Sequence, residues 1–323
     1  MSQAYFELEN SFRGSRDEIK NKLSIYDGLL ECFSSQADTP TVLDIGCGRG
    51  EWLELCSQKG FIATGIESNS SMVNECRSNN LNLNILQGNA LDLLKNISDQ
   101  SISIISAFHL IEHLSYEDIF YLFKQCKRII KNNGVCIFET PSIDNLIVSS
   151  NRFYMDPTHV TPINLENIKF NLMYQGFHEV KHYYINGGPL EKDSNHTVTR
   201  ILNGTAQDLL LIAIPTSNCP LLLENKSPSW ESTVNQSITT FKAAEEFDSQ
   251  LSSNLLEIYT RLNAYQNKIN YLENKLESLH DRFYKIYNLK IFKLLRIIRK
   301  ILLSIIQKVK SLLFNILKIA YRF

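Results

Sequence analysis

The chain of 323 residues is 44% hydrophobic and 21% charged, a composition typical of one catalytic-sized globular domain plus extra material, or of two small domains. With only 13 glycines and 8 prolines, it is neither collagen-like nor of low complexity. The seven cysteines form no C-x-x-C pair, which argues against a zinc cage or a disulfide scaffold and favours a reduced, cytosolic compartment. The N-terminal segment is polar and acidic, so no secretory signal peptide is expected.

The net charge of −1 hides an asymmetry between the two ends of the chain. Residues 284–323 contain ten lysines and arginines and no acidic residue, so residues 1–283 carry a net charge of −11. An acidic body and a basic, apolar tail indicate a molecule of two parts that have different partners.

In residues 1–216, short apolar runs alternate with helix-like segments. Strands are expected at 41–45, 61–67, 81–87, 101–109 and 135–140, with a closing antiparallel pair at 176–185 and 208–214. Helices are expected at 50–60, 70–78 and 116–131, the last of them stopping at an Asn132-Asn133-Gly134 turn. This alternation predicts an α/β domain with a doubly wound, Rossmann-like sheet of seven strands.

The character of the chain changes after residue 216. Residues 217–246 hold two prolines, many serines and asparagines and no clean period, so we expect a linker. In residues 247–286, apolar residues alternate at spacings of four and three: Leu251, Leu255, Ile258, Leu262, Tyr265, Ile269, Leu272, Leu276, Leu279, Phe283 and Ile286. This 3.5-residue period favours a coiled coil that forms a homo-oligomer over the alternative, a helix packed on the domain with a 3.6-residue period. The mixed seam does not distinguish a dimer from a trimer.

Residues 287–323 alternate apolar clusters with basic residues at helical spacing. Their longest charge-free stretches, 301–307 and 311–317, are far shorter than the ~20 residues of a membrane-spanning helix. A basic amphipathic helix suits the surface of an anionic membrane, so we expect peripheral attachment. A continued helical stem is an alternative; a nucleic-acid arm is disfavoured by the many apolar residues, so no nucleic-acid partner is expected.

The strongest motif is VLDIGCGRGEW at residues 42–52, where a strand ending at Asp44 is followed by three glycines and a helix. Glycine permits close approach of a ligand to the backbone at the end of the strand. A dinucleotide fingerprint would need a further glycine where the chain has Glu51. The pattern instead resembles motif I of class I S-adenosylmethionine-dependent methyltransferases.

This resemblance implies S-adenosylmethionine as the cofactor. Glu67, at the end of the second strand, would bind both ribose hydroxyls. Asn89 stands where the family usually has Asp and would accept the adenine amine through its side-chain oxygen. Arg16 would help to close the site, or would simply lie on a surface helix. The expected cofactor residues are Arg16, Asp44, Gly46, Cys47, Gly48, Glu67, Ser68, Asn89, Ala90 and His109.

Acid–base candidates follow the fourth strand in the segment HLIEHL, namely His109, Glu112 and His113. Methyl transfer from a sulfonium is a direct displacement that depends on alignment and needs no metal, so no metal ligand is assigned. A hydroxyl acceptor would benefit from a base. The alternatives are that His109 only lines the methionine pocket and that His113 caps the next helix.

A second polar cluster follows the fifth strand, in residues 139–146 and 152–162. It is rich in groups that bind polyols and adds Asp156 and His159 to the catalytic candidates. Arg152, Tyr154 and Asn145 belong to the same cluster. The alternative is an ordered surface loop whose shape is fixed by prolines.

The segments LDIGCGRGEWLEL, HLIEHL, ETPS and FYMDPTH together resemble the methyltransferase domain of bacterial O-antigen chain-terminating enzymes of the polymannose type, without the kinase domain of some members. The resemblance implies methylation of the terminal non-reducing sugar of a lipid-linked polysaccharide. It also implies a trimer, a polymerising glycosyltransferase as partner, and a place on the cytoplasmic face of the bacterial inner membrane. Two other functions stay open: an inert scaffold for polysaccharide synthesis, and a small-molecule or quinone methyltransferase.

Overall fold

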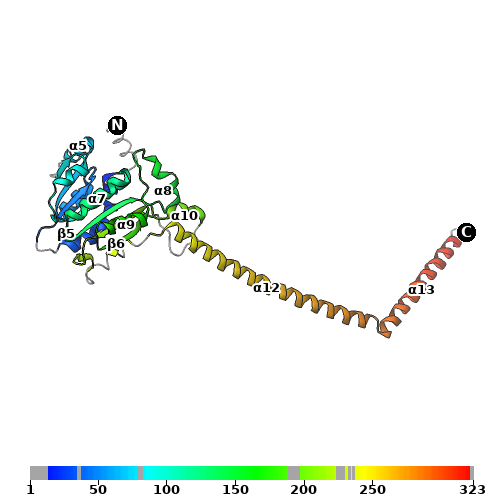
Figure 1. Ribbon diagram of the computed structural model, residues 1–323. Helices are drawn as coiled ribbons and strands as arrows, with labels where there is room; N and C mark the ends of the chain where they lie inside the picture. Colours follow the sequence, from blue (N-terminus) through cyan, green and yellow to red (C-terminus); the bar gives the residue numbers. More distant parts are fainter. Residues whose placement is uncertain are drawn as a thin grey trace. The chain divides into compact units, whose positions relative to one another are not determined.

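The computed structural model describes residues 14–34, 38–78, 83–187, 197–222, 230–231, 234 and 237–320. The chain divides into two compact units, residues 1–249 and 250–323 (Figure 1).

The first unit is built on a seven-stranded sheet with the order β3-β2-β1-β4-β5-β7-β6. The first five strands run parallel, and β7 is antiparallel to both β5 and β6. The strands are β1 (Thr41–Ile45), β2 (Ile62–Glu67), β3 (Asn84–Gln87), β4 (Ile102–Phe108), β5 (Ile130–Pro141), β6 (Glu179–Ile185) and β7 (Asp208–Ile214). The expected seven-stranded, Rossmann-like sheet and its closing antiparallel pair are confirmed.

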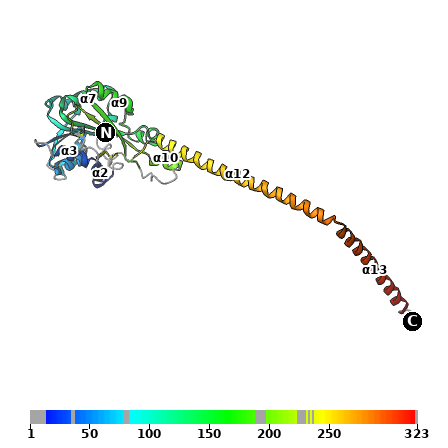
Figure 2. The same ribbon diagram turned by 90° about the horizontal axis from the view of Figure 1, so that it is seen from below.

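Helices cover both faces of this sheet, with α2 and α3 on one side and α7 and α9 on the other (Figure 2). Alternate residues of β7 enter the two core layers, Leu210 and Ile212 on one side, Leu209 and Leu211 on the other. The helices are α2 (Arg16–Leu23), α3 (Asp27–Ser34), α4 (Glu51–Gln58), α5 (Ser70–Ser78), α6 (Ala90–Leu93), α7 (Tyr116–Ile129), α8 (Leu146–Ser150), α9 (Leu165–Tyr174) and α10 (Val198–Gly204). Short 3-10 turns are η1 (Ser24–Tyr26), η2 (Leu94–Asn96), η3 (Ile111–His113), η4 (Arg152–Met155) and η5 (Pro220–Leu222).

The turn expected at Asn132-Asn133-Gly134 is wrong, because these residues lie within β5. Helix α7 ends at Ile129 and the strand begins at the next residue. Ile102 pairs with Ile130 but Ile104 pairs with Val135, so β5 takes up extra residues in a bulge. The bulge contains asparagines and a glycine, which are also typical of turns, so the sequence alone suggested a turn here.

The expected linker, residues 217–246, also needs correction where the structure describes it. Cys219, Leu221, Trp230 and Val234 are buried in the same core layer as α2 and α3. The indole N–H of Trp230 donates to the carbonyl of Ile25 at 2.9 Å. These apolar side chains are scattered among serines and asparagines, so no period reveals them.

Two long helices follow, α12 (Thr240–Tyr287) and α13 (Lys290–Ala320). Helix α12 begins inside the expected linker, with Thr240 and Ala243 buried. The residues of the predicted heptad seam, Leu251 to Ile286, are each 45–75% exposed in the single chain. Among the described helices, none combines the length and apolar character needed to cross a membrane.

Candidate functional site

Four of the expected site residues meet at one edge of the sheet. Strands β1, β2, β3 and β4 are parallel, so their carboxyl ends lie together. Asp44, Glu67, Asn89 and His109 lie at or just after these four ends. Ligands of open α/β sheets bind outside this edge.

The glycine loop after β1 has the form expected of a cofactor cradle. Gly46, Gly48 and Gly50 have φ angles of 74°, 53° and 80°, which L-residues with side chains rarely adopt. A Cβ atom at Gly46 would lie 3.1 Å from Leu110, and one at Gly50 would lie 2.8 Å from Leu83. Backbone conformation therefore favours glycine at all three positions, and a side chain at Gly46 or Gly50 would also crowd a leucine.

The Glu67 carboxylate faces this loop and is only 9% exposed. Its Oε2 accepts the N–H of Gly48 at 2.9 Å, and its Oε1 accepts the N–H of Asn69 at 2.7 Å. Each carboxylate oxygen has a further lone pair, so the side chain can still accept two hydroxyl protons. These two acceptor oxygens fit the ribose hydroxyls of S-adenosylmethionine.

Asp44 and Cys47 have different surroundings from Glu67. Asp44 is buried, and its Oδ1 accepts the hydroxyl proton of Ser106 at 2.7 Å. The Cys47 side chain is buried next to Gly65, where an added Cβ would meet its sulfur at 2.5 Å. Burial also raises the pKa of Cys47, so only its backbone can take part in a polar cofactor contact.

Arg16 reaches the outside of the glycine loop. It donates to the carbonyl of Arg49 at 2.8 Å and pairs with Glu54 at 3.0 Å and Glu51 at 3.5 Å. These contacts tie Arg16 to the glycine loop and to α4, and its expected cofactor contact stays a prediction.

In the turn after β3, Asn89 has a capping role. The Oδ1 atom of Asn89 accepts the N–H groups of Leu91 and Asp92, at 2.9 and 3.3 Å, and so caps α6. The oxygen expected to bind the adenine amine is thus engaged in the cap. Ala90 begins α6, and Ser68 is exposed beyond β2.

His109 is the first residue after β4 and has a left-handed backbone, with φ 50°. Such a conformation is uncommon for a residue with a side chain and is found at functional sites. Its Nδ1 lies 3.3 Å from Glu112, and its Nε2 lies 3.5 Å from Glu139 and 3.8 Å from Asp208. Reduced hydration lowers the pKa of His109, but the carboxylates, Asp208 first among the charges, raise it well above its ordinary value. The surrounding carboxylates thus favour the protonated form of His109.

Three further residues of this cluster, Tyr26, Asn186 and Asp208, were not identified from the sequence. Tyr26 donates to Glu139, and Asn186 donates to Asp208 at 2.8 Å. Burial raises the pKa of Asp208, His109 lowers it and Glu139 raises it, with a net value of about 6. Asp208 could have been found, because an antiparallel final strand starts at the edge where the parallel strands end. Tyr26 carries no local signal.

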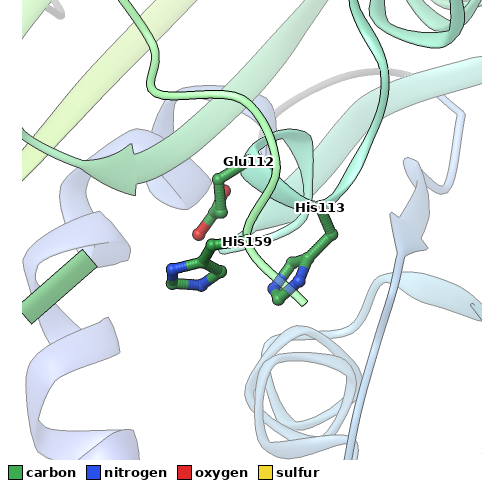
Figure 3. Close-up of side chains that lie close together, drawn as sticks. All are labelled: Glu112, His113 and His159. Carbon is green, nitrogen blue, oxygen red and sulfur yellow. The ribbon is translucent and has the colours of Figure 1, made fainter. Parts of the chain in front are cut away.

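A second cluster unites Glu112 and His113, from the segment after β4, with His159 from the loop after β5 (Figure 3). The backbone N–H groups of Val160 and Thr161 donate to the carbonyl of Glu112 at 2.9 and 3.0 Å, which ties the loop to η3. Burial raises the pKa of Glu112, but the hydrogen bond from His109 and nearby positive charge lower it more. Burial lowers the pKa of His113, so this ring is neutral at pH 7.

Asp156 organises the loop that carries His159. Its Oδ1 accepts both the N–H and the hydroxyl proton of Thr158, at 2.8 and 2.6 Å. Its other oxygen lies 4.0 Å from Nε2 of His159. Asp156 therefore positions the loop, and its predicted catalytic role stays a prediction.

A pocket lies between the His109 cluster and the loop. It is lined by Pro141, Val148, Arg152, Phe153, Gln207 and Asp208. Arg152 donates to Gln207 at 2.7 Å. Asn145 is buried and caps α8, so it is structural, whereas Tyr154 is exposed.

A family profile described as a methyltransferase domain matches residues 17–180, half of the chain. The chain belongs to this methyltransferase family. The expected class of enzyme, an S-adenosylmethionine-dependent methyltransferase, and its cofactor are confirmed at the level of the family.

Solved and curated methyltransferases share this domain. A SAM dependent methyltransferase from Archaeoglobus fulgidus is 32% identical, with a TM-score of 0.55, and covers 65% of this chain and 98% of its own. The ubiquinone biosynthesis O-methyltransferase of Pasteurella multocida is 29% identical over 34% of this chain and 51% of its own length. That of Coxiella burnetii is 32% identical over 31% of this chain and 42% of its own. The chain thus spans about half the length of these curated relatives.

Proposed function

We propose that the protein methylates a hydroxyl of the non-reducing terminal sugar of a lipid-linked surface polysaccharide and so ends chain growth. The observation that carries this proposal is the pocket lined in part by Arg152, Gln207 and Asp208, of which Asp208 lies 3.8 Å from Nε2 of His109. A guanidinium, an amide and a carboxylate match the alternating donors and acceptors of a polyol. The resemblance of the loop segments to O-antigen chain-terminating enzymes supports the same substrate.

Different residues would bind the cofactor, accept the proton and orient the acceptor. When bound, S-adenosylmethionine supplies a methyl group activated by its sulfonium charge. Glu67 and the glycine loop would hold it at the carboxyl edge of the sheet. Asp208, with a pKa of about 6, is ionised at neutral pH and would accept the proton that the sugar hydroxyl gives up. His109 would donate a hydrogen bond to the acceptor and steady the Asp208 carboxylate.

The C-terminal helices would place this site at the membrane. The exposed apolar seam of α12 would pair with other copies, a trimer being our preferred state, because an uncovered seam of this length is unfavourable in water. The basic residues of α13 would attach the assembly to the cytoplasmic face of the bacterial inner membrane. A polymerising glycosyltransferase would supply the polysaccharide.

The proposal is tested on the polysaccharide itself. Surface polysaccharide from cells that carry the wild-type gene, a Glu67→Gln allele or a deletion would be compared by mass and linkage analysis. We expect a terminal O-methyl sugar and a narrow length distribution only with the wild-type gene. Identical termini in all three strains would exclude this function.

A quinone methyltransferase is the second candidate, since the curated relatives act in ubiquinone biosynthesis by name. Their similarity covers only a third of this chain, and this function leaves the exposed seam without a role. Quinone extracts of the deletion strain distinguish the two, because accumulation of an unmethylated quinone precursor would support this candidate. Absence of S-adenosylmethionine binding by the full chain at millimolar concentration would leave only the inert scaffold.

A further inference from the structure

Donor atoms of Glu112, His113 and His159, one from each side chain, all lie within 4.8 Å of one another (Figure 3). If all three separations had this upper value, a point between them would lie about 2.8 Å from each donor. Bonds from imidazole and carboxylate to a zinc-like ion measure about 2.0–2.2 Å. Side-chain shifts below about 1 Å would therefore bring all three donors to bonding distance.

The hydrogen bonds around the two imidazoles assign their protons. Nδ1 of His159 lies 2.7 Å from the carbonyl oxygen of Phe153, which can only accept, so this nitrogen carries the proton. Nδ1 of His113 lies 2.8 Å from the hydroxyl of Thr158, whose own proton goes to Asp156 at 2.6 Å. The hydroxyl thus accepts from His113. When Nδ1 holds the proton of an uncharged ring, Nε2 bears the lone pair that can bind a metal.

This arrangement is typical of metal-binding histidines, in which the second ring nitrogen donates to a fixed oxygen that sets the tautomer. The third donor has a similar character. The Glu112 side chain is fully buried, and its Oε1 faces Nδ1 of His109 at 3.3 Å, a long and poorly aligned contact. Its Oε2 accepts from Thr140 at 3.0 Å, which orients the carboxylate.

Anchoring of the loop does not require these side chains. The backbone N–H groups of Val160 and Thr161 already bind the carbonyl of Glu112. Two imidazoles and a buried carboxylate would be a costly way to repeat this contact. We propose that Glu112, His113 and His159 bind one divalent first-row transition ion, with Zn²⁺ as the first candidate.

The donor set selects the kind of ion. Two imidazoles and one carboxylate suit Zn²⁺, Fe²⁺ or Co²⁺, whereas Mg²⁺ and Ca²⁺ prefer oxygen ligands. Three protein ligands leave a coordination position open. That this position receives an acceptor oxygen rests on the proposed function; metal binding itself does not.

Cobalt titration of the full-length protein tests the site. Protein stripped with chelator would be titrated with Co²⁺, without S-adenosylmethionine or acceptor, and followed by visible absorption. We expect one Co²⁺ per chain, micromolar or tighter affinity, bands lost on adding Zn²⁺, and no thiolate charge-transfer band, because all seven cysteines are buried.

Three variants make the result specific. His113→Gln and His159→Gln should each weaken Co²⁺ binding by about 10-fold or more, and the double variant should abolish it. His182→Gln, at an exposed position of β6, is the matched control and should bind as the wild type does. Circular dichroism and S-adenosylmethionine binding of each variant check the fold. Absence of Co²⁺ bands in protein that binds S-adenosylmethionine, or bands that survive in the double variant, would overturn the metal site and leave the methyltransferase proposal standing.

Discussion

Glu67 is the residue whose substitution tests the cofactor pocket most directly. In Glu67→Gln, one carboxylate oxygen becomes an NH₂ group that faces the N–H of Gly48 or Asn69. Loss of charge-assisted hydrogen bonds to the ribose should raise the dissociation constant for S-adenosylmethionine by about 10- to 100-fold. Isothermal titration calorimetry measures this. Glu117→Gln, exposed on α7, is the control, and a change below twofold in Glu67→Gln would contradict the assignment.

The charge state of His109 gives a second prediction. Since its pKa in the folded protein is raised by Asp208 and its neighbours, protonated His109 stabilises the fold below pH 6.5, and this contribution is lost as the pH rises through the raised pKa. NMR titration of ¹³C-labelled histidines in metal-free protein should give His109 a midpoint above 6.5. His182, whose pKa burial lowers, should titrate below 6.5.

Asp208 supplies the internal control for this titration. Asp208→Asn removes the largest charge that raises the pKa of His109, so its midpoint should fall while that of His182 stays unchanged. An unaltered His109 midpoint would show that the two groups are not coupled.

The sequence located those site residues that follow strands or form motifs. Asp44, Glu67, His109, Glu112 and His159 could be found because parallel strands bring their ends together. Tyr26 and Asn186 were beyond reach, since tertiary packing alone brings them to Glu139. The protonation of His109 likewise depends on carboxylates from other strands.

At the level of the elements, Trp230 decides where the domain ends. The side chain is 2% exposed, packs on the Tyr183 ring at 5.4 Å and donates to Ile25. Trp230→Ala should lower the free energy of unfolding by about 3–5 kcal/mol, because it leaves a cavity in the core. Denaturant unfolding followed by circular dichroism measures the loss. Phe241→Ala, at a position 72% exposed, should change stability by less than about 0.5 kcal/mol.

If Trp230→Ala destabilised the protein as little as this control, residues 217–246 would be a linker after all.

A comparison with the strands explains why the sequence suggested a linker at residues 217–246. A strand such as β7 can be predicted because its residues form a continuous apolar run, LLLIAI, which is buried on both faces of the sheet. Cys219, Leu221, Trp230 and Val234 instead lie in a stretch rich in serine and asparagine, and composition alone averages them away.

For the whole molecule, the exposed seam of α12 predicts an oligomer. Leu262→Asp with Leu272→Asp places charges at two seam positions, where a coiled coil would have to bury them, so the assembly should dissociate to monomers. Sedimentation equilibrium of the full chain measures the mass. Asn267→Asp with Asn274→Asp adds the same charges on the opposite side of the heptad and should leave the mass unchanged. A monomeric wild type would contradict the prediction.

The tail predicts attachment to anionic membranes by charge and apolar burial together. Residues 284–323 carry ten basic residues and no acid, and α13 exposes isoleucines and leucines between them, such as Ile301 and Ile305. The full chain should float with vesicles containing phosphatidylglycerol but not with neutral vesicles, and a chain ending at residue 286 should not float. Lys300→Glu with Lys308→Glu should weaken flotation at low salt, since each basic residue near the surface contributes about 1 kcal/mol. If the shortened chain floated equally well, the membrane role of α13 would be contradicted. Helix α13 would then be a continued helical stem, and its removal should lower the number of chains in the oligomer.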